Sequence, residues 1–369
     1  MQVRWLEVVA FRNYASLGFA PDRGLNVLVG RNGHGKTALL EAVHLLLTAR
    51  SFRTAQVAEC VAWGVAEAMV SGEVTHGPQR RAVRLTVAQQ GGIDVGAGLC
   101  PWARVVTFAA PDLALVTGAP QVRRAYLDGA AAKFWPAHGE VCRRYRLVLY
   151  QRGRLLGRLA GRADQGDLLA PWDDQVARLG SEIVHRRLET LEALGEDVGE
   201  VWRALVGEGE GLELVYVPEV IPGGSREETA RGLLAMLSAR RRAEVARGVT
   251  LAGPHRDDLA IRLAGMDARS YASRGAQRML ALTLRLAEAA AVRRRLGAAP
   301  VLLLDDVLSE LDLAARERVL RWLAGAGQVL LSTTDAVPLP GGLGTTWVVD
   351  AGTLAVHTGD MVVTAGEVA

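Results

Sequence analysis

Several residue types are scarce in this chain of 369 residues, and each scarcity excludes a class of protein. There are three cysteines, Cys60, Cys100 and Cys142, and they stand too far apart to form a CxxC zinc pair or an even-numbered disulfide framework. No apolar run approaches the roughly 18 uncharged residues that a membrane-spanning helix needs. We therefore expect a protein of the reducing cytoplasm that has no membrane partner.

The chain lacks an excess of either charge, because its 43 basic residues nearly balance its 40 acidic residues and the net charge is +3. Strong attraction to nucleic acid must therefore come from local patches rather than from the overall charge. Lysine is the rarest cation, because it occurs only at Lys36 and Lys133. Half of the residues are apolar, so the chain can bury a large core, and its length favours two or three domains.

The two ends of the chain alternate between strand and helix patterns. Strands are predicted at residues 5–10, 25–29, 65–74, 81–87 and 103–108, with a helix at 36–49. After residue 250 the sequence predicts helices at 277–298 and 314–324, and strands at 301–304, 329–332 and 346–349. We expect residues 1–112 and 250–369 to form one discontinuous α/β domain.

The middle of the chain, residues 113–249, is predicted to be a mainly helical insertion, with helices within 122–151, 172–205 and 227–246. Glycines such as Gly180 and Gly195 interrupt these patterns, so we expect helices too short for a sustained heptad repeat. Residues 121–162 hold ten Lys or Arg against two acids, whereas residues 163–230 hold sixteen acids against five arginines. The insertion thus has a basic and an acidic half.

A phosphate-binding loop is predicted between the strand at 25–29 and the following helix. The segment matches G-x-x-x-x-G-K-[ST] and consists of Gly30, Arg31, Asn32, Gly33, His34, Gly35, Lys36 and Thr37. Its glycines allow successive N–H groups and the helix N-terminus to point at one anion. In this role Lys36 neutralises the β- and γ-phosphates and Thr37 ligates Mg²⁺, so ATP and Mg²⁺ are the expected cofactors.

Two carboxylates follow the buried strand at 301–304. Adjacent acids at the end of such a strand are costly unless a cation or a proton shares the charge. We assign Asp305 to the metal ion and Asp306 to the water that attacks ATP. With Lys36 they form the predicted catalytic set.

A helix start at residues 271–278 distinguishes between kinds of phosphate-loop protein. Ser273 and Gly275 are placed where their backbone amides can contact an anion, and Gln277 follows. Alone, this segment predicts only a capped helix. Together with the phosphate loop and the two acids it resembles the S-x-G signature of ABC-type ATPases, which implies that the segment covers ATP held by a second subunit. We call residues 271–278 the signature segment.

The chain as a whole resembles the RecF family of bacterial recombination-mediator ATPases, which are related to the heads of SMC proteins. The resemblance rests on the segments 11–14 (FRNY), 30–37, 51–54 (SFRT), 123–128 (RRAYLD), 253–259 (GPHRDDL), 271–278 and 304–312. It implies an ABC-type head with a helical insertion, and an ATP-dependent homodimer that closes on double-stranded DNA. It further implies slow ATP hydrolysis and, with RecO and RecR, loading of RecA at gaps.

The most concentrated arginines are candidates for contact with DNA. They are Arg143, Arg144, Arg146, Arg152 and Arg154. A competing interpretation is that some of them pair with the acidic half of the insertion. His255 is equally open, since it can sense the γ-phosphate or merely bind a loop carbonyl.

Two other functions share the phosphate loop. One is an ABC-type motor of a transporter, which is disfavoured because residues 333–335 lack the switch histidine and Asp306 replaces the usual Glu. The other is a phosphotransferase such as a kinase, which has no use for the signature segment. No Q-loop is identified between Lys36 and Arg123.

Overall fold

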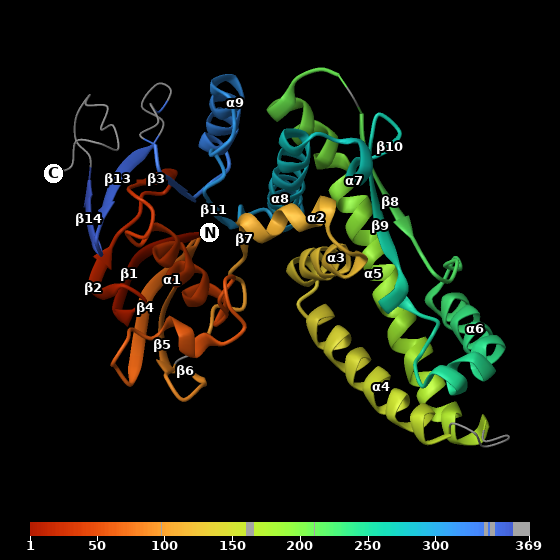
Figure 1. Cartoon of the computed structure of the whole chain (residues 1–369). Coiled ribbons are helices and arrows are strands. Elements are labelled where there is room, and N and C mark those ends of the chain that lie inside the picture. Colours follow the sequence, from red (N-terminus) through yellow and green to blue (C-terminus); the bar gives the residue numbers. More distant parts are fainter. Residues whose placement is uncertain (97, 160–165, 210, 336–338, 340–343, 357–369) are drawn as a thin grey trace. The chain divides into compact units, whose positions relative to one another are not determined.

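The structure is a computed structural model that describes residues 1–96, 98–159, 166–209, 211–335, 339 and 344–356 (Figure 1). The chain divides into two compact units. Unit 1 comprises Met1–Asp112, Val201–Glu208 and Arg278–Ala369, and unit 2 comprises Leu113–Glu200 and Gly209–Gln277. Unit 2 therefore extends past the expected limit at residue 249. Over the described ranges, no helix has the length and apolar character needed to cross a membrane.

A six-stranded sheet in unit 1 combines strands from both ends of the chain, in the order β14-β13-β3-β12-β11-β7. The strands are β3 (Leu25–Val29), β7 (Val105–Phe108), β11 (Val301–Asp305), β12 (Val329–Thr333), β13 (Thr345–Asp350) and β14 (Thr353–Val356). All neighbours are parallel except β14, which is antiparallel to β13. Every residue of β3 and β12 is buried, as is typical of a parallel sheet that is covered on both faces.

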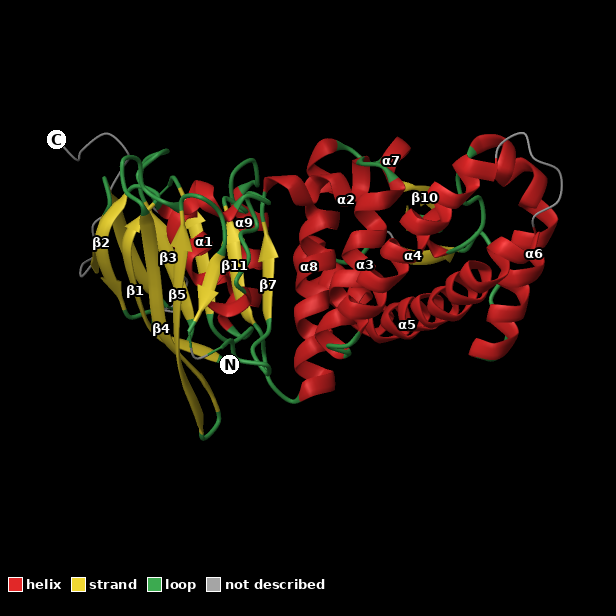
Figure 2. Cartoon of the chain, turned by 90° about the horizontal axis from the view of Figure 1, so that it is seen from below, coloured by secondary structure: helices red, strands yellow, loops and turns green. Residues whose placement is uncertain are grey.

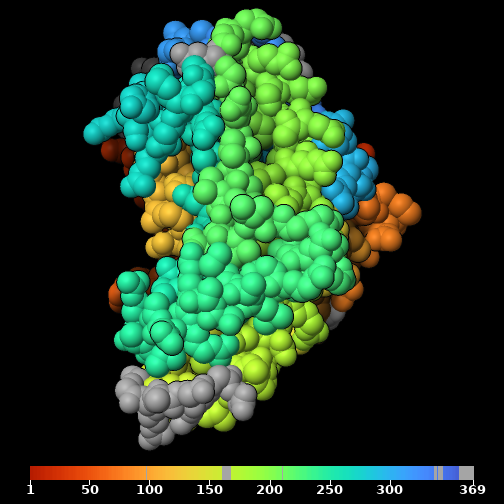
Figure 3. Space-filling model, turned by 90° about the vertical axis from the view of Figure 1, so that its right-hand side faces the viewer, coloured from red at the N-terminus to blue at the C-terminus, as the bar shows by residue number. Residues whose placement is uncertain are grey.

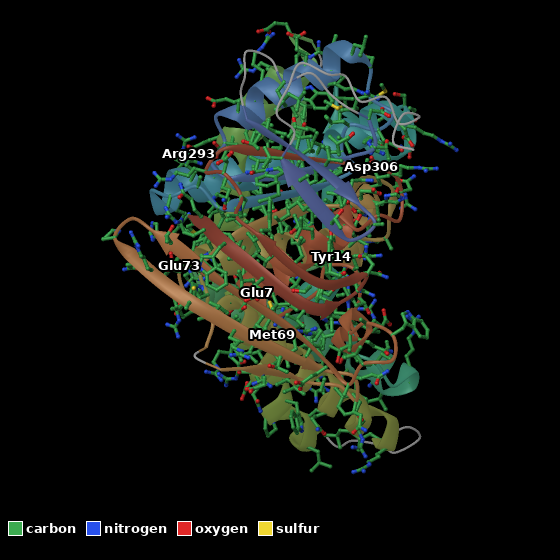
Figure 4. All side chains as sticks on the ribbon, turned by 90° about the vertical axis from the view of Figure 1, so that its left-hand side faces the viewer. Glu7, Tyr14, Met69, Glu73, Arg293 and Asp306 are labelled. Carbon is green, nitrogen blue, oxygen red and sulfur yellow. The ribbon has the colours of Figure 1, made fainter. Side chains whose placement is uncertain are left out.

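A second sheet of unit 1 is antiparallel, with the order β2-β1-β4-β5-β6 (Figure 2). Its strands are β1 (Gln2–Phe11), β2 (Tyr14–Phe19), β4 (Glu67–His76), β5 (Gln79–Ala88) and β6 (Ile93–Val95). Helix α1 (Lys36–Thr48) contacts β1, β4 and β5 of this sheet and β11 and β12 of the other. The large core of unit 1 forms around it. The outer face of the antiparallel sheet carries Glu7, Met69 and Glu73 (Figure 4).

Shorter elements and the last helices complete unit 1. These are η1 (Val57–Cys60), η2 (Ala110–Leu113), α9 (Leu313–Ala324) and most of α8 (Arg274–Leu296). The side chain of Asp312 caps α9 by accepting a hydrogen bond from the N–H of Ala315.

Unit 2 is mainly helical, as the sequence predicts. Its helices are α2 (Ala114–Thr117), α3 (Pro120–Phe134), α4 (His138–Leu159), most of α5 (Gly166–Val206), α6 (Arg226–Arg247), η3 (Pro254–Arg256) and α7 (Ala268–Tyr271). Figure 3 shows the face of unit 2 on which α6 lies. The expectation of short helices is wrong for α5, which spans 41 residues and continues through its glycines. Gly180 has a packing role, because a Cβ there would lie 3.1 Å from Leu233 and 3.2 Å from Pro254.

A small sheet in unit 2 was not predicted. Strands β8 (Leu212–Val217), β9 (Asp258–Leu263) and β10 (Met266–Asp267) form an antiparallel sheet in the order β10-β9-β8. Because β9 pairs with β8 along its whole length, the chain after residue 249 stays in unit 2 until Gln277.

Candidate functional site

The phosphate loop, residues 30–37, connects the buried strand β3 to α1 in unit 1. Its glycines are required by geometry. A Cβ on Gly30 would lie 2.2 Å from the carbonyl oxygen of Val349, and Gly33 and Gly35 have φ angles of +84° and +113°. Both angles lie in the left-handed region, where a side chain is strained. The chain therefore curls tightly at the end of β3, as the motif predicts.

The carbonyl groups of the loop are directed at partners within unit 1. The ammonium of Lys36 donates to the carbonyl oxygens of Gly30 (2.5 Å) and Arg31 (2.9 Å). A carbonyl oxygen aimed at a phosphate would repel it, whereas backbone N–H groups attract it. Lys36 therefore occupies these two carbonyl oxygens, and the N–H of His34 also donates to the carbonyl oxygen of Arg31 over 3.4 Å.

The turn between β1 and β2 supports the loop from outside. Asn13 Nδ2 donates to the carbonyl oxygen of His34 over 3.2 Å, and the Tyr14 hydroxyl donates to that of Gly35 over 3.0 Å. The N–H of Gly352, in the turn between β13 and β14, also donates to the His34 carbonyl over 3.3 Å. The FRNY segment thus helps to hold the shape of the phosphate loop, which we also call the nucleotide cradle. The sequence alone does not show this role.

The side chain of His34 projects toward the turn after β13. Its Nδ1 lies 2.8 Å from Asp350 Oδ1 and 3.3 Å from the backbone nitrogen of Ala351. His34 therefore belongs to the predicted loop, and its imidazole faces Asp350 and Ala351.

Lys36 is a buried cation at the start of α1. Burial lowers the pKa of its ammonium, and the nearby carboxylates of Asp306 and Asp305 act in the opposite direction. The two carbonyl groups that it contacts, of Gly30 and Arg31, belong to the same phosphate loop.

A hydroxyl and a carboxylate meet where the phosphate loop enters α1. The Thr37 hydroxyl donates to Asp305 Oδ1 over 2.8 Å, and the Ser332 hydroxyl donates to the same oxygen over 2.6 Å. Asp305 lies opposite Ser332 in the pairing of β11 with β12. Hydroxyl and carboxylate oxygens fit the preference of Mg²⁺, so Thr37 and Asp305 could hold the ion. Ser332 was not predicted.

Asp306, which Figure 4 labels, follows β11. Its backbone is in a left-handed conformation, with φ +51°. Its N–H donates to Ser332 Oγ over 3.0 Å. Its carbonyl oxygen accepts from Arg278 Nη2 (2.5 Å) and from the Ser309 hydroxyl (3.0 Å). The backbone of Asp306 is therefore fixed on both sides.

A buried carboxylate on α1 joins the FRNY and SFRT segments. Glu41 is fully buried and accepts two hydrogen bonds from Arg12, at 2.9 Å and 2.8 Å. It also accepts from the Ser51 hydroxyl at 2.5 Å and from Arg53 at 3.3 Å. Burial alone would raise the pKa of Glu41, but the hydrogen bonds from Arg12 and Ser51 outweigh it and lower the pKa.

Two diagnostic segments of unit 2, RRAYLD and GPHRDDL, bind each other. Arg123 makes two 2.8 Å hydrogen bonds to the carboxylate of Asp258, and Arg124 donates to the carbonyl oxygen of Asp257 over 2.6 Å. Asp128 accepts two 2.8 Å hydrogen bonds from Arg187 of α5. These charged residues therefore stabilise the interior of unit 2.

His255 takes the structural role that the sequence left open. Its Nε2 lies 3.2 Å from the carbonyl oxygen of Thr250, and its Nδ1 lies 2.9 Å from the Tyr145 hydroxyl. Burial lowers the pKa of His255 to about 4. The imidazole is thus neutral at pH 7 and held by partners within unit 2.

The signature segment forms an exposed helix start, as predicted. The Ser273 hydroxyl accepts a 3.2 Å hydrogen bond from the N–H of Ala276, and both Ser273 and Gly275 are exposed. The amide of Gln277 donates to the carbonyl oxygen of Arg269 over 3.3 Å. These residues belong to unit 2, whereas the phosphate loop belongs to unit 1.

The arginines of α4 divide into two groups. Arg144, Arg146 and Arg154 are exposed, and Arg143 is exposed but makes 2.7 Å and 2.6 Å hydrogen bonds to Glu140. The assignment of Arg152 to DNA is wrong, because this side chain is fully buried.

The buried guanidinium of Arg152 is satisfied by three partners of unit 2. It contacts Asp173 at 2.8 Å, Glu244 at 2.6 Å and the Thr250 hydroxyl at 2.9 Å. Arg152 therefore matches the competing interpretation, because its guanidinium pairs with acids, namely Asp173 of the acidic half and Glu244 of α6.

Comparison with known proteins gives consistent results. A family model described as an AAA domain matches residues 6–94. The chain is 39% identical over 346 residues to the DNA replication and repair protein RecF of Heliobacterium modesticaldum, covering 90% of this chain and 92% of that protein. It is 38% identical over 374 residues to the RecF of Frankia alni, covering 95% and 98%.

Solved structures agree with these relatives. A structure of the recombination mediator protein RecF-ATPrS in the RecFOR pathway matches with a TM-score of 0.86 and 26% identity, over 97% of this chain and 98% of that one. An SMC head bound to the C-winged helix domain of ScpA matches with a TM-score of 0.56 and 15% identity, over 97% of both chains, which is a likeness of fold alone. The predicted ABC-type head with a helical insertion is confirmed.

Proposed function

This chain belongs to the RecF family of DNA replication and repair proteins, and from that membership we propose that it is an ATP-driven homodimer that clamps double-stranded DNA. A solved relative is named as a RecF–ATP structure in the RecFOR pathway. By analogy, this chain acts with RecO and RecR in the cytoplasm to load RecA at gaps.

The observation that carries the proposal is the division of predicted ATP contacts between the two units. Unit 1 contains the cradle, the Thr37–Asp305 pair and Asp306, whereas the exposed helix start at Ser273 and Gly275 belongs to unit 2. A second copy that places its Ser273 amides over the γ-phosphate would complete the site. ATP then favours the closed pair over the open one, because only the closed pair makes both sets of contacts.

Hydrolysis in this site would be slow and would act as a timer. Bound Mg²⁺, held by Thr37 and Asp305, would neutralise charge on the phosphates. Lys36 binds the β- and γ-phosphates, and Asp306 orients the water that attacks the γ-phosphorus to give ADP and phosphate. Asp306 is one methylene shorter than the Glu usual in transporters, which favours weak activation of the water.

The exposed arginines of α4 are the proposed DNA contacts. Arg144, Arg146 and Arg154 present positive charge to solvent, and Arg143 shares its charge with Glu140. Each phosphate that such a side chain neutralises should steepen the dependence of log affinity on log salt by about 0.9.

Size-exclusion chromatography with ATP and Mg²⁺, with and without duplex DNA, tests the proposal. The wild-type protein should form dimers that bind duplex, and Lys36→Met should abolish both. Ser273→Arg should keep nucleotide binding but block dimerisation, since the side chain obstructs the partner's phosphate. Ser270→Arg is the matched control, because Ser270 is also exposed and lies only three residues away. ATP-dependent dimers of Ser273→Arg would refute the proposed closure.

A further inference from the structure

One arginine of α8 reaches the loop that follows β11. Arg278 Nη2 donates to the carbonyl oxygen of Asp306 over 2.5 Å and contacts the Ser309 hydroxyl at 2.8 Å. Its Nη1 lies 3.5 Å from Glu310 Oε2. All four residues belong to unit 1, so a single guanidinium fixes three positions of this loop.

The loop needs such support because its backbone is strained at two positions. Asp306 and Glu310 have φ angles of +51° and +65°, and neither is glycine. Such conformations persist only where surrounding contacts hold them, and they concentrate at functional sites. Without Arg278, the carbonyl group of Asp306 would keep only the hydrogen bond from Ser309.

The guanidinium is held in place despite an unsatisfied donor of its own. The Arg278 side chain is only 12% exposed, and its buried Nε finds no hydrogen-bond partner among the described residues. A buried donor without a partner is destabilising. The two Nη atoms of Arg278 thus make their contacts with the loop even though the Nε atom is left without a hydrogen bond.

We propose that Arg278, the last residue of the signature segment, is a positioning residue that fixes Asp306 for water activation and connects it mechanically to Ser273 and Gly275. The proposal rests on the proposed function, in which Asp306 orients water and the start of α8 covers ATP bound by a partner copy. Arg278 lies in the first turns of α8, which begins at Arg274.

The connection follows from the stiffness of a helix. A ligand that displaces or orders the first turn of α8 also moves Arg278, because both belong to one hydrogen-bonded helix. Arg278 passes that change to the Asp306 backbone of its own chain. Covering the partner's ATP would thus adjust the hydrolytic geometry of the covering chain, so that the two ATP sites of a dimer report on each other.

A double-mutant cycle on ATP turnover tests the positioning role. Arg278→Gln should lower kcat about tenfold or more, because a misplacement of about 1 Å can reduce a rate ~100-fold, while KM stays near its wild-type value. Asp306→Asn should lower kcat in the same way. The double variant should be no slower than Asp306→Asn alone, within about twofold, because both act through one group.

Two further variants separate positioning from general destabilisation. Arg285→Gln is the matched control, since Arg285 also lies on α8 and makes ion pairs, with Asp112 and Glu288, away from the loop. It should leave kcat unchanged. Arg278→Lys keeps the charge but loses the planar fork, so it should restore kcat only in part.

Hydrogen exchange with ATP and Mg²⁺ tests the connection to the signature segment. Nucleotide should protect the backbone of residues 306–310 in the wild-type protein, and this protection should be lost in Arg278→Gln while residues 274–277 stay protected.

Multiplicative effects in the double variant, or a normal kcat for Arg278→Gln, would overturn the positioning role. Loss of kcat in Arg285→Gln to the same extent would also overturn it, and equal protection of residues 306–310 in Arg278→Gln would overturn the connection. If the wild-type protein hydrolyses ATP as a monomer, the clamp fails, but the cycle between Arg278 and Asp306 can still be measured.

Discussion

The Tyr14 hydroxyl donates to the carbonyl oxygen of Gly35 over 3.0 Å, and a Cβ on Gly35 would lie 2.6 Å from that hydroxyl. The Tyr14 hydroxyl can therefore approach this closely only because residue 35 is a glycine and has no side chain. This contact joins the FRNY segment to the phosphate loop.

Tyr14→Phe should weaken ATP binding about fivefold, because a net hydrogen bond contributes about 1 kcal/mol. Gly35→Ala should abolish binding, since it adds the clash and strains a φ of +113°. Fluorescence titration with a nucleotide analogue measures both. Tyr150→Phe, on the exposed face of α4, is the control and should bind as the wild-type protein does. Unchanged affinity in Tyr14→Phe would contradict the supporting role.

Thr37→Val should selectively reduce the contribution of Mg²⁺ to ATP affinity. The variant keeps the shape of the side chain but removes the hydroxyl that lies 2.8 Å from Asp305. We expect the ratio of affinities with and without Mg²⁺ to fall about tenfold, with binding in EDTA unchanged. Isothermal titration at several Mg²⁺ concentrations measures the ratio. Thr334→Val removes a hydroxyl just after β12 and should leave the ratio intact.

Arg152→Ala should change the stability of the protein, whereas Arg144→Ala should change its binding to duplex DNA. Arg152 is buried against Asp173 and Glu244, so its loss removes the guanidinium that both buried acids contact and leaves only Arg241 beside Asp173 and the N–H of Leu251 beside Glu244. It should reduce the free energy of unfolding by about 3–5 kcal/mol. Arg144 is exposed, so its loss should barely change stability but should reduce the salt slope of duplex binding by about 0.9.

Urea unfolding and binding titrations at several salt concentrations measure these two properties. A stable Arg152→Ala would contradict the burial argument. A wild-type salt slope in Arg144→Ala would remove that residue from the DNA surface.

Stability should fall as the pH decreases from about 6.5 to about 4, in part because of His255. Burial lowers the pKa of His255 from 6.5 to about 4 in the folded state, so over this range the unfolded chain binds a proton that the folded chain does not. The contribution is present above pH 6.5 and is lost by up to about 3 kcal/mol near pH 4. Urea unfolding across this range should show a shallower decline in His255→Gln. Parallel declines would rule out His255 as the source.

The parts of the site that depend on local spacing could be predicted from the sequence. Residues 30–37 are contiguous, and Asp305 and Asp306 directly follow an apolar run, so the cradle and the acids were recognisable without a fold. Ser332 and Arg278 were missed because their roles depend on strand register and on helix placement. Ser332 lies opposite Asp305 across 27 positions of sequence, and Arg278 reaches Asp306 across 28.

The fold shows the same division between local and distant information. Most helices and strands of unit 1 follow their hydropathy patterns. The paired strands β8 and β9 were missed because 40 residues lie between the end of β8 at Val217 and the start of β9 at Asp258. Counting charges along α4 identified its arginines, yet it could not show that Asp173 and Glu244 both contact Arg152. The glycines of α5 were misjudged because the close approach of Leu233 and Pro254 to Gly180 is a tertiary feature.

The pairing of Leu28 with Ser332 has a consequence for synthesis of the chain on the ribosome. The neighbours of β3 in the sheet, β12 and β13, are translated about 300 residues after it. Until then the apolar strand β3 has neither of its pairing partners. The nucleotide cradle can therefore form only after β12 and β13 have been translated, and products truncated before these strands should be unable to capture ATP.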